Sequence, residues 1–299
     1  MPLRSQLHVN KLLSNVSVQY KNNEYIWKDV FPIVNVVKDS DLYRVYDRNN
    51  LKVVETKRAP KAVANEFGFQ FSTASYNLEK HALKDYVGVD EEEQNDQGSL
   101  EVDTTEFLTD QIEKRAEIMT EALFVTANWS LNVSLAAGAS FSDNTTTSNP
   151  IPVFDTGGAT IIANGGKMHN FGIVPYAKYL SIKNHVSVID RVKYTSADIG
   201  EGAIASLLGL PKMLVPKAVK DSNADGVASS IAPIWSKCFL GYQAASPSLK
   251  TASCGLTFMG RQEVRTWIDN EKKAKAIEVE KNLQPKIVAS LTGYLISGA

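Results

Sequence analysis

This chain of 299 residues contains few cysteines, no long apolar run and almost no net charge. Its two cysteines, Cys238 and Cys254, are too few for a disulfide framework, so we interpret them as reduced thiols of a cytoplasmic product. No apolar run reaches the roughly 18 residues of a membrane-spanning helix, so we expect no membrane association. The N-terminal stretch MPLRSQLHVNKLLSNVSVQ lacks the apolar segment of a signal peptide, and we expect none.

Histidine is also rare, and the usual catalytic patterns are missing. The four histidines lie far apart, without the paired spacing of a metal site. The chain contains no Gly-x-Ser-x-Gly elbow and no His-Glu-x-x-His motif. A formal net charge of −1 provides no basic field that would hold nucleic acid by itself. We therefore expect no catalytic residues, no cofactor, no metal and no enzymatic activity.

Two fragments imitate ligand-binding motifs. Gly200-x-Gly202-x-x-Ala205 resembles a dinucleotide fingerprint, and Asp221 follows about 20 residues on, as that pattern requires. The residues TSAD separate these glycines from the expected strand VKY, so the tight strand-to-helix turn is lost. A nucleotide-binding enzyme that uses residues 200–205 stays open as an alternative of another class.

The second fragment, DSNADG at 221–226, matches the first half of a calcium loop. Its twelfth position, which needs a bidentate glutamate, is Ala232. We interpret the fragment as a turn.

The most informative stretch is DLYRVYDRNNLKVVETKR at 41–58. Asn49-Asn50 is a candidate two-residue hairpin turn, because asparagine tolerates the left-handed backbone of such turns. That register places opposite charges face to face in three pairs: Asp41 with Arg58, Arg44 with Glu55, and Asp47 with Lys52. Neither face is a clean apolar stripe, and an isolated hairpin is marginally stable in water. The stretch is either an ordinary surface hairpin or an arm that docks on another subunit.

Other segments of the first half have recognisable patterns. FPIVNVV at 31–37 predicts a strand, and the alternation of Phe67, Phe69 and Phe71 predicts another, followed by helical character around Leu78 to Leu83. An acidic connector at 90–103 leads to a long helix expected over 104–129. Its signals are a capping box, Asp103 with Glu106, and an apolar stripe at three- and four-residue steps: Leu108, Ile112, Ala116, Met119, Leu123 and Ala127.

The second half predicts a mixed architecture. Residues 130–170 are rich in Ser, Thr, Asn and Gly and predict loops or a domain junction. A helix is expected at about 176–185 after Pro175, because proline is favoured early in helices. The segments VIDRVKY, GEGAIASLLGL and KMLVPKAV then predict strand, helix and strand, and residues 255–299 predict mainly strands. The fold class is therefore α+β.

The order of these parts resembles the major capsid protein of tailed bacteriophages, which has the Hong Kong 97-type fold. The phrases that carry the resemblance are DLYRVYD, KRAP, SYNLEKHALKDYV, TEFLTDQI, HVSVIDRVKYT, GLTFMG and KIVASLTGYLIS. Together they span residues 25–299, and their order and spacing are more specific than any one of them. One departure is Asn184-His185-Val186, where many relatives carry proline after the histidine.

The resemblance implies a division of the chain into named parts: an N-terminal arm (1–37), an extended hairpin loop (38–66), a peripheral domain with a spine helix (67–149), an axial domain (150–254) and peripheral β segments (255–299). It also implies that Asp41, Arg44, Asp47, Lys52, Glu55 and Arg58 form an assembly interface on the extended loop.

The implied function is self-assembly, as homo-pentamers and homo-hexamers, into an icosahedral shell around double-stranded DNA. The resemblance further implies a portal and a separate scaffolding protein as partners, a location in the virion capsid, and assembly in the bacterial host cytoplasm. No sequence-specific DNA contact is expected. An encapsulin-like compartment that holds enzymes is the alternative within the same fold.

Overall fold

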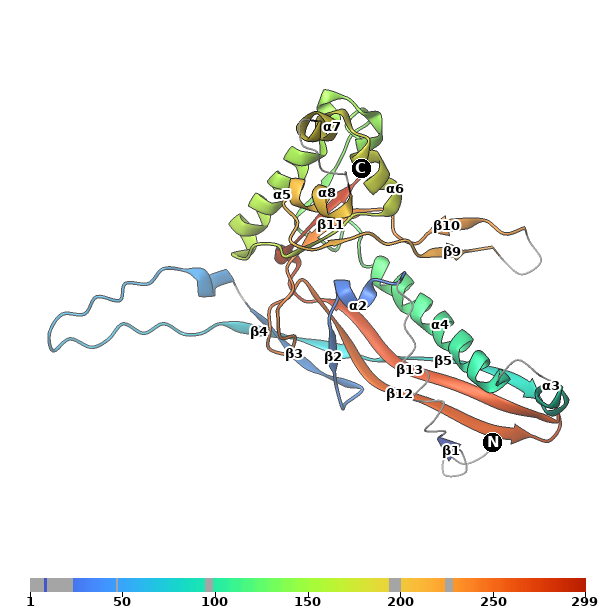
Figure 1. The fold of residues 1–299 in the computed structure, drawn as a ribbon. Coiled ribbons are helices and arrows are strands. Elements are labelled where there is room, and N and C mark those ends of the chain that lie inside the picture. The colour runs from blue at the N-terminus through green and yellow to red at the C-terminus, as the bar shows by residue number, and fades with distance from the viewer. Residues whose placement is uncertain (1–7, 10–23, 47, 95–98, 194–199, 224–227) are drawn as a thin grey trace.

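A computed structural model describes residues 8–9, 24–46, 48–94, 99–193, 200–223 and 228–299. Two sheets organise the fold: a long lower sheet crossed by one helix, and an upper sheet covered by shorter helices (Figure 1). An arm projects from one side of the molecule and a thin hairpin from the other (Figure 1). Helices and strands are mixed without a regular alternation, so the expected α+β class is confirmed.

The lower sheet is built on two long antiparallel strands of the C-terminal part, β12 (Gly255–Asp269) and β13 (Ala274–Ile287). β13 pairs on its other edge with β5 (Glu79–Gly88), and β12 pairs with β2 (Ile33–Asn35) and the short β1 (His8–Val9). The strands expected at 31–37 and in 255–299 are therefore confirmed. The prediction of helical character around Leu78 to Leu83 was wrong, because residues from Glu79 onward form β5, which pairs with β13.

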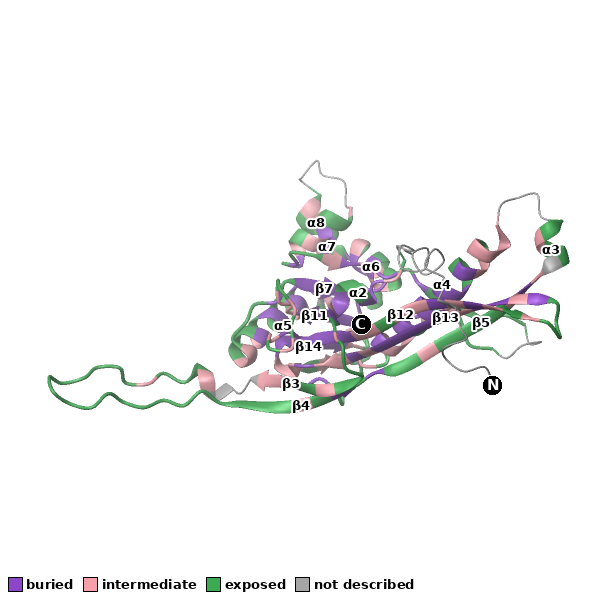
Figure 2. Ribbon diagram, turned by 90° about the horizontal axis from the view of Figure 1, so that it is seen from below, coloured by how far each residue is buried: buried purple, intermediate pink, exposed green. Residues whose placement is uncertain are grey.

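The helix that crosses this sheet, α4 (Leu100–Glu121), buries one stripe on it. Leu108, Ile112 and the adjacent strand residues Val264 and Ile277 belong to one buried cluster. The predicted helix is confirmed, but it begins four residues before 104 and ends at Glu121 instead of 129. The Asp103–Glu106 capping box was consequently wrong, since both residues lie inside the helix. Figure 2 shows the buried centre of β12 and β13.

The chain beyond α4 turns inward around aromatic side chains. Phe124 and Trp129 are buried, and their rings pack on each other and on Phe239. This packing explains why the periodic pattern does not continue as helix to 129. Ala127, assigned to the stripe, is exposed and lies beyond the helix.

The upper sheet has the strand order β6-β14-β11-β7-β8. Its strands are β6 (Asn132–Ser134), β14 (Gly293–Ser297), β11 (Cys238–Gly241), β7 (Phe171–Ile173) and β8 (Met213–Leu214). The last strand of the chain, β14, therefore lies in the upper sheet and not beside β12 and β13. β11 is entirely buried and pairs with β14 and β7.

Short helices cover the upper sheet (Figure 1): α5 (Pro150–Gly165), α6 (Tyr176–Lys183), α7 (Val186–Val192) and α8 (Glu201–Leu207). The helices expected after Pro175 and in GEGAIASLLGL are confirmed. The expected strand in VIDRVKY was wrong: His185 caps α7 by accepting a hydrogen bond from Ser187 N, at 3.2 Å.

Residues 130–170, whose composition predicted loops or a domain junction, contain the helix α5. A Cβ atom at Gly157 would lie 2.7 Å from Leu240 Cδ1 and 2.8 Å from Tyr294 Cδ1. The glycine therefore lets the helix approach β11 and β14 closely. The composition was interpreted as flexibility, whereas its role here is packing.

Further short elements complete the fold: α2 (Trp27–Val30), α3 (Val89–Glu93), and the 3₁₀ turns Arg48–Leu51, Phe141–Asp143, Thr146–Ser148 and Ser290–Thr292. Two separate two-stranded sheets carry the projections. β3 (Ser40–Tyr46) pairs with β4 (Phe71–Asn77) at the base of the arm, and β9 (Val219–Asp221) pairs with β10 (Ile231–Pro233) in the thin hairpin. None of the described helices is both long and apolar enough to cross a membrane.

Candidate assembly surfaces

The arm, residues 48–70, extends well away from both sheets (Figures 1 and 2). Its base is closed by Asn50, whose amide donates to the Gln70 carbonyl at 2.6 Å and whose side-chain oxygen accepts from Gln70 N at 3.0 Å. Several large apolar side chains along the arm are exposed: Leu51, Val53, Val63, Phe67 and Phe69. Exposed apolar side chains gathered on one projection are typical of interaction surfaces.

The predicted hairpin register was wrong. β3 pairs with β4, so Asp41 lies opposite Tyr76 and Arg44 opposite Thr73. Asn49 lies in a 3₁₀ turn instead of a two-residue hairpin turn. The expected strand alternation of Phe67, Phe69 and Phe71 is also mostly wrong, since β4 begins at Phe71.

The proposed interface residues consequently lie in two places. Asp41 and Arg44 are on β3, where Asp41 pairs with Lys38 at 3.1 Å and Arg44 stacks over the Phe71 ring at 4.7 Å. Lys52, Glu55 and Arg58 are exposed on the arm. Asp47 lies outside the described residues. Sequence reasoning missed Asn50 and Gln70, which close the base, because only the three-dimensional loop brings them together.

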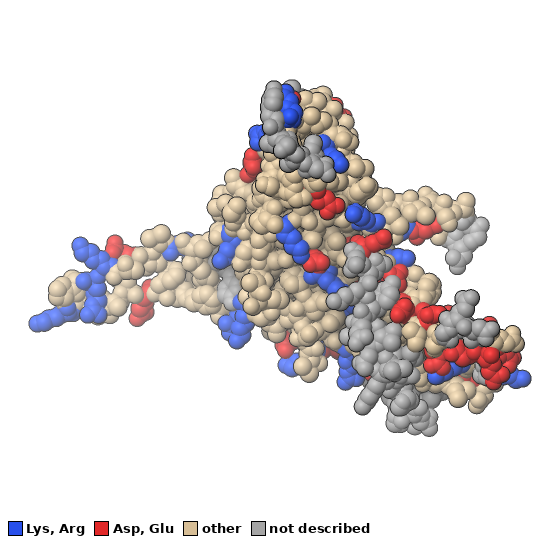
Figure 3. Space-filling model, in the orientation of Figure 1, with Lys and Arg blue, Asp and Glu red and all other residues tan. Residues whose placement is uncertain are grey.

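Charge is distributed unevenly along the molecule (Figure 3). The arm carries Lys52, Lys57, Arg58 and Lys61 against Glu55 and Glu66. At the opposite end, acidic side chains gather around α3 and the start of α4: Asp90, Glu91, Glu92, Glu93, Glu101, Asp103 and Glu106. Opposite charge at opposite ends favours head-to-tail association of copies.

A cavity of about 440 Å³ lies at the base of the arm. Its walls come from the arm, the end of α5 and the 3₁₀ turn before β14, and are mainly apolar. The residues that matter below are Leu51, Phe69 and Leu291, with the cations Arg44 and Lys167. Gly166 caps the end of α5 in the left-handed conformation and lies beside Leu51. Because Gly166 has no side chain, Leu51 can lie close to the helix end and form this part of the cavity wall.

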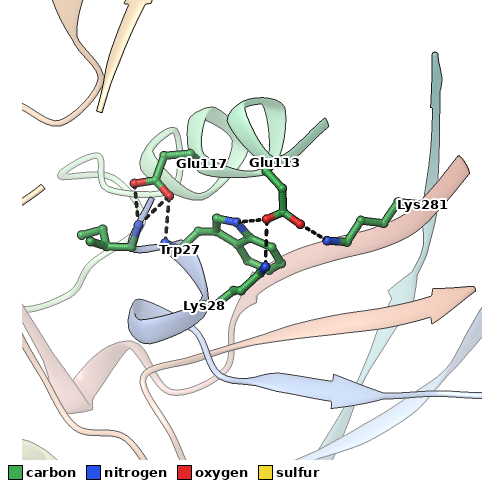
Figure 4. Close-up of polar contacts among 6 residues, drawn as sticks. Trp27, Lys28, Glu113, Glu117 and Lys281 are labelled. Carbon is green, nitrogen blue, oxygen red and sulfur yellow. Dashed lines mark hydrogen bonds and ion pairs between the residues drawn. The ribbon is translucent and has the colours of Figure 1, made fainter. Parts of the chain in front are cut away.

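A buried polar cluster fixes the N-terminal segment to α4 and the lower sheet (Figure 4). Glu113 of α4 accepts from Trp27 Nε1 at 2.8 Å and pairs with Lys281 at 2.5 Å and Lys28 at 3.1 Å. Burial raises the pKa of Glu113, but the two lysines outweigh it and hold that pKa below its ordinary value. Glu113 therefore stays ionised between its lysines.

Glu117, one turn further along α4, binds the same segment through neutral N–H hydrogen-bond donors, in contrast to the lysines of Glu113 (Figure 4). It accepts from the backbone of Ile26 at 3.1 Å and Trp27 at 2.8 Å, and from Trp235 Nε1 at 2.5 Å. Burial raises the pKa of Glu117, and these three donors offset part of that rise. Trp235 follows β10, so this carboxylate also ties the hairpin region to α4.

The motifs that imitate ligand sites find no support. α8 begins after Gly200, and the last described element before it is the helix α7, where a dinucleotide fingerprint requires a strand; residues 194–199 lie outside the described part of the chain. In DSNADG, residues 224–227 lie outside the described part of the chain. Cys238 and Cys254 are buried, and burial raises the pKa of each thiol to about 12. Among the described residues, no group of three or more His, Cys, Asp and Glu side chains could hold a metal ion.

These features define a class: an elongated α+β subunit with one long helix on a lower sheet, an upper sheet of its own, and a projecting arm. It is the Hong Kong 97-type fold of tailed-phage major capsid proteins, and the resemblance expected from the sequence is confirmed.

The comparisons with known proteins agree over nearly the whole chain. The major capsid protein of Burkholderia phage BcepMu is 23% identical over 303 residues, covering 97% of this chain and 96% of that protein. A crystal structure of a phage-related protein from Bordetella bronchiseptica RB50 has a TM-score of 0.80, 22% identity and 98% coverage of both chains. The capsid of cyanophage P-SCSP1u has a TM-score of 0.60 and 12% identity, covering 92% of this chain and 88% of that one.

The fold is shared more widely than phage capsids. The SrpI encapsulin of Synechococcus elongatus has a TM-score of 0.55 and 10% identity, covering 98% of this chain and 96% of that one. No family model matches the chain.

Proposed function

We propose that this chain is the major capsid protein of a tailed bacteriophage and that it assembles with copies of itself into a closed shell. The observation that carries the proposal is the likeness, over nearly the whole chain, to the major capsid protein of Burkholderia phage BcepMu and to the capsid of cyanophage P-SCSP1u. An icosahedral shell needs pentamers, and hexamers where it is larger. The chain has a structural role in this proposal, without catalysis.

The arm is the proposed assembly device. The arm extends beyond the body of its own subunit, exposes apolar side chains and carries the exposed Lys52, Glu55 and Arg58. We assign these three residues, with Asp41, Arg44 and Asp47, to the interface with a neighbouring copy. Because every subunit repeats the contact, one interface of this kind is used many times in a closed shell.

The proposed contents are double-stranded DNA, enclosed without sequence-specific contact. A net charge of −1 supports this, because a basic inner wall would bind phosphates in a salt-dependent way and oppose movement of the genome. A portal and a separate scaffolding protein are the proposed partners, the virion capsid is the proposed location, and the host cytoplasm is the proposed place of assembly.

An enzyme-filled compartment of the encapsulin kind is the second candidate, favoured by the likeness to the SrpI encapsulin. Particles purified from the native host and treated with nuclease separate the two. The capsid proposal expects DNA that survives the nuclease inside the particles. Particles that contain a co-purified enzyme and no protected DNA would contradict it and favour the compartment.

A further inference from the structure

The thin hairpin of β9 and β10 exposes an apolar face. Among the described strands, these two pair only with each other. Ile231 lies opposite Asp221, and Pro233 opposite Val219, so the alternation of side chains places all four on one face. All four are exposed, with 70% of Ile231 and 46% of Val219 accessible to solvent.

The other face of the hairpin is partly covered. Lys220 and Ala232 lie opposite each other on that face, and both are half-buried. The hairpin therefore presents its apolar face outward, and its surface shows few charged side chains (Figure 3). A two-stranded ribbon of this kind is marginally stable alone and gains stability when its apolar face is covered.

The cavity at the base of the arm complements this face in polarity and charge. It is concave and mainly apolar, like a site that receives a few side chains. Its charged lining residues, Arg44 and Lys167, are both cations. The charged residue on the hairpin face is Asp221. Its pKa is lowered, chiefly because its carboxylate accepts a hydrogen bond from Asn223 N. An apolar face with one carboxylate is thus complementary to an apolar cavity with two cations.

The two surfaces lie on opposite sides of one molecule. The hairpin projects on the side of α6, whereas the arm and the end of α5 lie on the other side (Figure 1). Surfaces so placed cannot meet within one subunit. They can meet between successive copies arranged head to tail, which closes a ring when the rotation between copies permits.

We propose that the apolar face of the β9–β10 hairpin of one copy docks into the cavity at the arm base of the next copy. The inference rests on the proposed shell function, because it assigns a second ring contact to the same self-assembly. Asp221 approaches Arg44 and Lys167, and Ile231 and Val219 cover the apolar wall around Leu51. The arm and the hairpin then contact neighbours on opposite sides of each subunit.

Cysteine crosslinking in assembled particles tests the contact. The variant Ile231→Cys with Ala252→Cys places one thiol on the hairpin face and one in the cavity wall. Native Cys238 and Cys254 are fully buried, so a short bismaleimide reacts with the introduced thiols. We expect a ladder from dimers up to the full ring on denaturing gels, and monomers from either single variant.

Other outcomes overturn the proposal. Wild-type-like particles without a ladder show that the hairpin does not reach the cavity, while the shell function stands. Dimers from Ile231→Cys alone indicate a symmetric hairpin contact. A ladder from Val63→Cys with Ala252→Cys, but not from the hairpin pair, shows that the neighbour's arm fills the cavity. Failure of the wild-type chain to form particles is a failure of the proposed function itself.

A second variant separates assembly from folding. Ile231→Asp adds a charge to the docking face, and we expect particle yield to fall about tenfold or more, the effect of roughly 1.4 kcal/mol at one contact. Ile268→Asp is the matched control, because Ile268 is similarly exposed, at 71%, near the far end of β12. Both variants should keep the wild-type circular dichroism spectrum and melting temperature. Normal particle yield from Ile231→Asp would contradict the docking.

Discussion

Glu113 carries a charge inside the protein, and its stabilising effect depends on Lys281 and Lys28. Its pKa is lowered in the folded chain, so its contribution to stability is present above the ordinary value of 4.5 and is lost as the pH falls through the lowered folded-state pKa. Removing one partner of a buried pair costs about 3–5 kcal/mol. We predict that Glu113→Gln lowers the melting temperature strongly at pH 7, and that its deficit shrinks below about pH 4.

Glu101→Gln is the matched control for this prediction. Glu101 lies on the same helix and pairs with Lys275 at 2.5 Å, but both side chains are partly exposed. An exposed pair contributes at most about 1 kcal/mol. Thermal unfolding followed by circular dichroism from pH 3 to pH 8 measures both variants. Equal deficits for the two, or a Glu113→Gln deficit that is independent of pH, would contradict the assigned role.

Two glycines of similar appearance in the sequence have opposite expected effects. Gly157→Ala would bring a Cβ atom within 2.8 Å of Leu240 and Tyr294, so we predict a loss of about 1–3 kcal/mol from overpacking. Gly202→Ala meets no atom within 4 Å inside α8 and should stabilise the chain by about 0.5–1 kcal/mol. Denaturant titration measures both changes. A stabilised Gly157→Ala variant would show that α5 can move away from the upper sheet.

At the scale of elements, mutations at the base of the arm distinguish the predicted hairpin register from the observed one. Arg44 lies opposite Thr73 and stacks on Phe71, whereas Glu55 lies on the arm and is not its cross-strand partner. We predict that Arg44→Glu reduces particle yield and that adding Glu55→Arg does not restore it. A double-mutant cycle scored by sedimentation gives the coupling, which we expect to be near zero. Recovery in the double variant would support the Asn49–Asn50 register.

The elements with strong, uninterrupted patterns were predictable from the sequence. The part of the apolar stripe formed by Leu108, Ile112 and Ala116 and the strands of residues 255–299 are confirmed because their periodicity records which face is buried. Errors arose where distant contacts decide the structure. Val186–Val192 forms a helix that His185 caps, and Gly157 of α5 serves helix-to-sheet packing.

The candidate site was predictable only in outline. The mixed faces of 41–58 left a surface hairpin and an arm both open, and residues 48–70 project away from both sheets. Its register was not predictable, because the strand that pairs with β3 begins 25 residues after that strand ends, across a loop without periodicity. The partners of Glu113 and Glu117 come from residues 26–28, 235 and 281, and no local sequence signal connects these segments.

At the scale of the whole molecule, the basic arm and the acidic region around α3 lie at opposite ends (Figure 3). We predict that the double reversal Lys57→Glu with Arg58→Glu slows assembly at low salt, because it removes the attraction between successive copies. The deficit should shrink in about 1 M salt, where the screening length falls to about 3 Å. Light scattering follows the rate. A deficit that is equal at both salt concentrations would contradict an electrostatic role for the arm.

The central claim is that this chain builds a closed shell from copies of itself. Electron cryo-microscopy of the purified protein, at several salt concentrations and with scaffold added where needed, tests it most directly. The account predicts closed particles of pentamers, with hexamers in larger shells, in which residues 48–70 of each subunit lie on a neighbouring copy. Uniform, folded monomers under every condition would contradict it.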